Sequence, residues 1–139
     1  MDKNIINSFE LVTSQISLVY NMMTIKYPHK LLHLSVLTEM IKFLRFVKSE
    51  QNKKTSFNDD YIYTIIHDDQ YIYLKSHLTG LSSNYTHVDV IHFSSELNAQ
   101  MNIAKCFMID LIIKLEHKDY EVEYLHVITD ILKIYAIIM

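Results

Sequence analysis

Glycine, proline, cysteine and arginine each occur once in this 139-residue sequence, and tryptophan is absent. With so few residues suited to sharp turns, long helices joined by few loops are favoured over a many-turned β sandwich. A single glycine also excludes the glycine-rich loops that bind nucleotide phosphates. A single arginine and a net charge of −3 argue against non-specific binding to nucleic acid, because such binding needs clustered cations.

The single cysteine, Cys106, rules out an intramolecular disulfide and a thiolate zinc site, which is typical of an intracellular, reducing location. We expect Cys106 to be a small core residue, because it lies within an apolar helical pattern. Neither a secretory signal nor an apolar run of the ~18–20 residues that span a bilayer is visible. We therefore expect a cytoplasmic protein with no membrane partner. The bias towards Lys, Ile, Asn and Tyr is typical of an AT-rich genome, such as that of a virus or phage, which would make the location the host cytoplasm.

A chain of this length folds as one domain, which we assign to residues 1–139. Its first part predicts a helical hairpin, because apolar residues recur at steps of three and four. We expect the first helix over residues 3–25 and the second from Pro28 to near Glu50. The apolar stripes are Ile5, Phe9, Val12, Ile16, Val19 and Met23 on the first helix, and Leu34, Leu37, Met40, Ile41, Leu44 and Val47 on the second.

The middle of the chain departs from this helical period. A polar connection covers residues 51–60, and the apolar period then becomes two in "YIYTII", in "YIYLKS" and over residues 85–93. Two more helices follow, with Ser94 or Ser95 as the cap of the first. The predicted fold class is therefore α+β, with two helical hairpins, N- and C-terminal, flanking a three-stranded antiparallel β-meander in the order α-α-β-β-β-α-α.

The last two predicted helices carry apolar stripes of their own. The stripe residues are Leu97, Met101, Ala104, Met108, Leu111 and Leu115 on one, and Leu125, Ile128, Leu132, Tyr135 and Met139 on the other. The final segment, "ILKIYAIIM", is apolar on more than one side and needs cover on several faces. It either threads the bundle or meets a second subunit, for which a two-fold homodimer is the default form.

Two "YIY" triplets flank an "HDD" turn at residues 67–69. A three-residue loop there would place the tyrosines on one face of the sheet and aliphatic residues on the other. Tyrosine is enriched in recognition surfaces, although tyrosines also stabilise an exposed sheet without any partner. The predicted partner-binding face consists of Tyr61, Tyr63, Tyr71, Tyr73, Lys75, His87 and Asp89.

Histidines offer the main alternative chemistry, since imidazole and carboxylate groups can hold a metal ion. The candidate ligands in the meander are His67, Asp69, His87 and Asp89. The motif "HKLLH" also places His29 and His33 at a metal-binding spacing, but the simpler interpretation is two surface histidines on a lysine-bearing helix.

The function that we predict is that of a non-enzymatic protein-binding domain, such as an adaptor, an inhibitor or a chaperone. It would self-associate as a homodimer and engage another protein through the tyrosine-rich face or a helix groove. The alternatives are a small metal-dependent enzyme or metal sensor, and a structural subunit of a larger assembly. We expect no catalytic residue, no cofactor and no nucleic-acid partner. The general plan is similar to that of secretion chaperones and small viral or phage adaptors.

Overall fold

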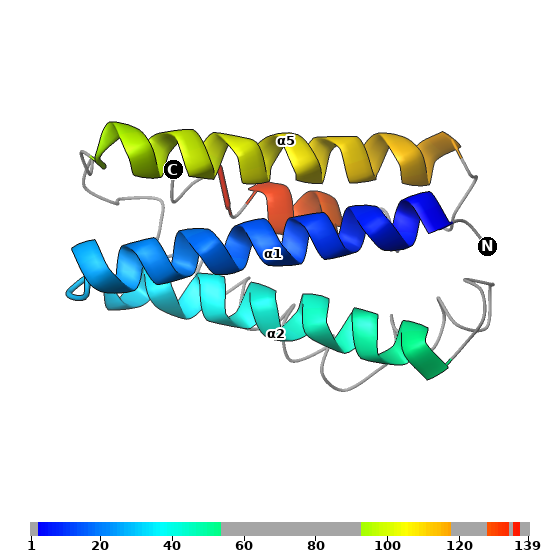
Figure 1. The fold of residues 1–139 in the computed structure, drawn as a ribbon, viewed down its shortest axis with the longest axis horizontal. Coiled ribbons are helices and arrows are strands. Elements are labelled where there is room, and N and C mark those ends of the chain that lie inside the picture. Colours follow the sequence, from blue (N-terminus) through cyan, green and yellow to red (C-terminus); the bar gives the residue numbers. More distant parts are fainter. Residues whose placement is uncertain (1–2, 54–92, 118–127, 134, 137–139) are drawn as a thin grey trace.

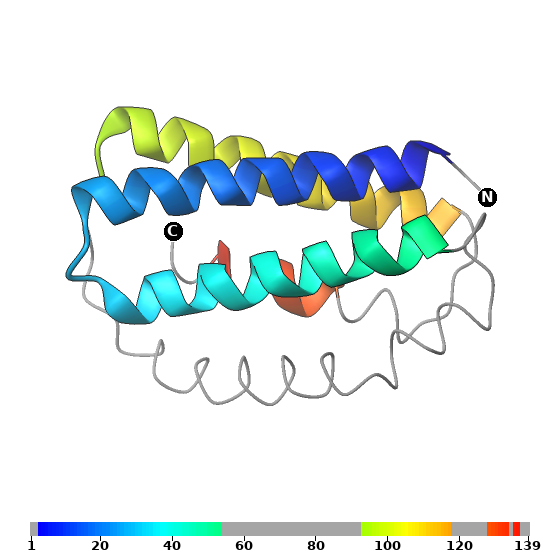
Figure 2. The same ribbon diagram turned by 60° about the horizontal axis from the view of Figure 1, so that its bottom comes forward.

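A computed structural model describes residues 3–53, 93–117, 128–133 and 135–136 of the chain. These residues form three long helices, α1 (Lys3–Lys26), α2 (Leu31–Lys53) and α5 (Ser95–His117). Residues 128–133 and 135–136 are helical as well, and we call them the terminal segment. Figure 1 shows α1 between α2 and α5, antiparallel to both, with the terminal segment behind it. Figure 2 shows the same hairpin of α1 and α2 from a lower angle.

The predicted α+β fold class is wrong, because the described residues are helical and contain no strand. The first two strands of the predicted meander, and the third except for Phe93, lie outside the described residues. Phe93 is not in a strand, and it packs into the helical core just before α5. The physical reason is that the apolar faces of the described helices cover one another, so their burial needs no sheet.

The core lies along one side of each described helix, as the apolar residues at steps of three and four predicted. All six stripe residues of α1 and all six of α5 are buried, which confirms both stripes. On α2 the stripe is wider than expected, since Val36 and Phe43 are buried as well, while Leu34 is only partly buried. In the terminal segment the buried residues are Ile128, Ile131 and Tyr135.

Proline ends α1, but it does not begin α2. The residue that precedes a proline avoids the helical conformation. Tyr27 precedes Pro28, and α1 accordingly ends one residue earlier, at Lys26. The amide of Lys30 donates a hydrogen bond to the Tyr27 carbonyl at 3.1 Å, which closes the turn. We predicted Pro28 in the first turn of the second helix, whereas that helix begins at Leu31.

Of the two predicted caps, Ser94 and Ser95, it is Ser94 that caps α5. Its Oγ accepts a hydrogen bond from the amide of Leu97 at 3.3 Å, which satisfies one of the free amides of the first helical turn. The Ser94 amide donates in turn to the Tyr27 hydroxyl at 3.1 Å. The ring of Tyr27 packs edge-on against Phe93, with centroids 5.3 Å apart. The start of α5 is therefore fixed against the α1–α2 turn.

The terminal segment is attached to α5 by a buried hydrogen bond. The Tyr135 hydroxyl donates to the Met101 carbonyl at 3.0 Å. Burial raises the pKa of Tyr135, so its phenol stays protonated and remains a donor. Of the two arrangements that we considered for this segment, its described residues adopt the one in which it threads the bundle.

Candidate protein-binding site

The residues of the predicted partner-binding face all lie outside the described residues. This holds for Tyr61, Tyr63, Tyr71, Tyr73, Lys75, His87 and Asp89. It holds equally for the candidate metal ligands His67, Asp69, His87 and Asp89. The candidate site is therefore built from the described helices.

The two histidines of "HKLLH" occupy different environments. His29 is exposed in the turn, whereas His33 is buried on α2, with 5% of its surface exposed. Burial lowers the pKa of His33, and the positive charge of Lys30 lowers it further. The interpretation as two surface histidines is thus wrong for His33. In the part of the chain that the structure describes, no group of three side chains is placed to hold a metal ion.

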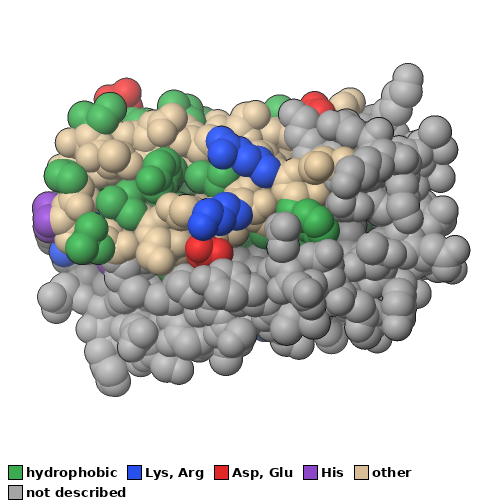
Figure 3. Space-filling view, turned by 90° about the horizontal axis from the view of Figure 1, so that it is seen from below, with side chains coloured by type: hydrophobic (Ala, Val, Ile, Leu, Met, Phe, Trp, Pro, Cys, Tyr) green, Lys and Arg blue, Asp and Glu red, His purple; other side chains and the backbone are tan. Residues whose placement is uncertain are grey.

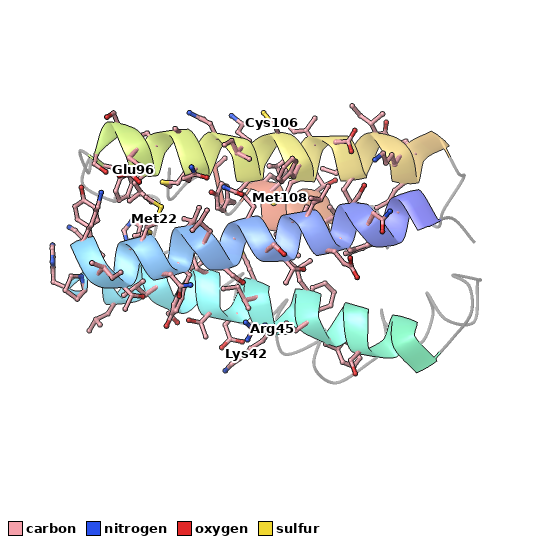
Figure 4. All side chains as sticks on the ribbon, viewed as in Figure 1. Met22, Lys42, Arg45, Glu96, Cys106 and Met108 are labelled. Carbon is pink, nitrogen blue, oxygen red and sulfur yellow. The ribbon has the colours of Figure 1, made fainter. Side chains whose placement is uncertain are left out.

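Cys106 is exposed, which contradicts the prediction that it is a core residue. Its neighbour in the same apolar run, Met108, is buried. Figure 4 shows the two side chains on opposite sides of α5, with Met108 towards α1 and Cys106 pointing out of the bundle. Two residues along a helix correspond to a turn of about 200°, so residues at this spacing face opposite directions.

The outer face of α1 carries a second apolar line, opposite its buried stripe. Leu11, Leu18 and Ile25 are exposed by 48%, 42% and 80%, and they follow one another at intervals of seven residues. Three short uncharged residues alternate with them along the helix, and all three are exposed. We call these six residues the α1 seam: Asn7, Leu11, Ser14, Leu18, Asn21 and Ile25.

Spacing and composition distinguish the α1 seam from an ordinary solvated helix face. Alternating steps of four and three are the spacing along which a second helix packs in a coiled coil. A solvent-facing helix normally carries charged residues there. Only three of the 24 residues of α1 are charged, Lys3, Glu10 and Lys26, and none of them belongs to the α1 seam. Depletion of charge is the compositional feature that marks the centre of a protein interface.

The outer face of α5 carries a comparable line, in which every residue is exposed. Ile103, Ile109 and Ile113 are exposed by 39–46%. We call this line the α5 seam: Ala99, Ile103, Cys106, Ile109 and Ile113. Two polar residues, Asn102 and Asp110, lie among them on the same face of α5 and are exposed as well.

The outer face of α2 has a different character. It exposes Lys42 and Arg45, and Lys42 lies 3.5 Å from the carboxylate of Glu39. Figure 3 shows this side of the molecule, with basic side chains beside an acidic one near the middle and hydrophobic side chains gathered where α1 and α2 join. Exposed cationic side chains of this kind are typical of a solvated helix face.

Polar contacts fix α1 and α5 relative to each other and hold the two seams in place. The Gln15 side-chain amide donates to the carbonyl of Gln100 at 3.0 Å and to its side-chain oxygen at 2.7 Å. Near the other end of α5, the Lys114 ammonium donates to the Ser8 hydroxyl at 2.9 Å. The register of the two helices is therefore set at two places along their length.

Both seams escaped the sequence prediction, although the signal was present in the residues. Leu11, Leu18 and Ile25 repeat every seven positions, and such a repeat on the side away from the core stripe predicts a second packing face.

Among the described helices, none combines the length and the apolar character of a helix that spans a bilayer. Comparison with protein families, with curated proteins and with solved structures finds no significant match to this chain.

Proposed function

We propose that this protein is a non-enzymatic protein-binding module, and that the α1 seam receives an amphipathic helix of another protein. The observation that carries the proposal is the row of exposed apolar residues at intervals of seven, on a line of α1 that contains no charged residue. A helix that inserts its own apolar residues between Leu11, Leu18 and Ile25 removes these side chains from water. At about 25 cal/mol per Å² of apolar surface, that burial favours association.

The chemistry of the α1 seam indicates the kind of helix that it takes. Asn7, Ser14 and Asn21 are short and uncharged, so they allow a helix to approach closely and can form hydrogen bonds with polar side chains. No lysine or arginine lies on the α1 seam to attract an acidic partner or an anionic lipid surface. The partner segment is therefore an apolar, weakly charged helix face that spans up to about five turns.

A photo-reactive phenylalanine at position 14 tests this proposal. Ser14 lies in the middle of the α1 seam and is exposed, so the reactive group would face the bound helix. We expect irradiation of cells that make the protein naturally to give one discrete adduct, whose cross-linked segment mass spectrometry identifies. A synthetic peptide of that segment should bind the purified protein. Leu18→Glu should weaken that binding about 10-fold to 100-fold, because it places a charge in the apolar contact.

The matched control is the same photo-reactive group at Arg45, which is exposed on α2. It should give no adduct with the partner, and Lys42→Glu should leave peptide binding unchanged. An adduct at position 14 that persists in the Leu18→Glu protein would contradict the proposal. So would an adduct with a second copy of this chain, or a protein that binds phospholipid vesicles through α1.

A further inference from the structure

We draw no further inference here: the strongest candidate, the exposed α5 seam on the outer face of the bundle around Cys106, carries nothing because nothing in the described part of the structure shows what covers it.

Discussion

His33 is a buried titratable residue, with 5% of its surface exposed. Burial, followed by the positive charge of Lys30, lowers its pKa below the ordinary 6.5. In the unfolded chain the same imidazole binds a proton more readily. The stability that this difference provides is fully present above pH 6.5 and is lost as the pH falls through the lowered pKa of the folded state.

We therefore predict that His33→Gln reduces the loss of stability at acid pH. Between pH 7 and pH 5 the free energy of unfolding should fall less steeply in the variant than in the wild type, because glutamine cannot take up a proton. Urea denaturation at half-unit steps of pH measures both slopes. His29→Gln is the control, since His29 is exposed in the turn, and it should keep the wild-type slope. Identical slopes for His33→Gln and the wild type would contradict the prediction.

At the scale of the helices, caps and stripes carry the structure. The cap of α5 predicts that Ser94→Ala lowers the free energy of unfolding by about 1 kcal/mol, because the Leu97 amide loses its acceptor. Ser95→Ala is the matched control. Ser95 is the first residue of α5 and is exposed, so its replacement by a better helix former should change the stability little. Denaturation curves that shift equally for the two variants would show that Ser94 is not the cap.

The helical stripes could be predicted from sequence because long helices repeat their pattern many times. Six stripe residues on α1 and six on α5 establish both the period and the buried side. The three segments assigned to strands are only six to nine residues long, so each repeats its pattern fewer times and gives a weaker signal. The position of Cys106 could have been read as well, since it lies two residues from both Ala104 and Met108 and therefore outside the stripe.

The candidate site was harder to predict, because exposure depends on the whole bundle. Leu11 and Val12 are adjacent and similar in character, yet Leu11 is half exposed and Val12 is buried. The longer stripe of α1 identifies the core side, but only the placement of α2, α5 and the terminal segment around α1 determines how much of the second apolar line stays exposed.

At the scale of the whole molecule, α1 is the central helix, and its two apolar lines should differ in their importance for folding. Ile16 is fully buried, so Ile16→Ala should lower the free energy of unfolding by about 2–5 kcal/mol. Leu18 lies on the α1 seam, and Leu18→Ala should cost less than about 1 kcal/mol. Chemical denaturation of both variants, measured at one protein concentration, checks the contrast. A larger loss for Leu18→Ala would place the α1 seam inside the fold rather than on its surface.

The contacts of α1 with α5 join distant parts of the chain, which affects how the protein is made. Ser8 and Lys114 are 106 residues apart in sequence, and Gln15 and Gln100 are 85 apart. During synthesis α1 leaves the ribosome long before α5 does, and at 5–20 residues per second the interval is roughly 5–20 s. In that time α2 can cover only one side of the buried stripe, and the other side faces solvent. The nascent chain is therefore most vulnerable to aggregation and to chaperone capture in the interval before α5 emerges.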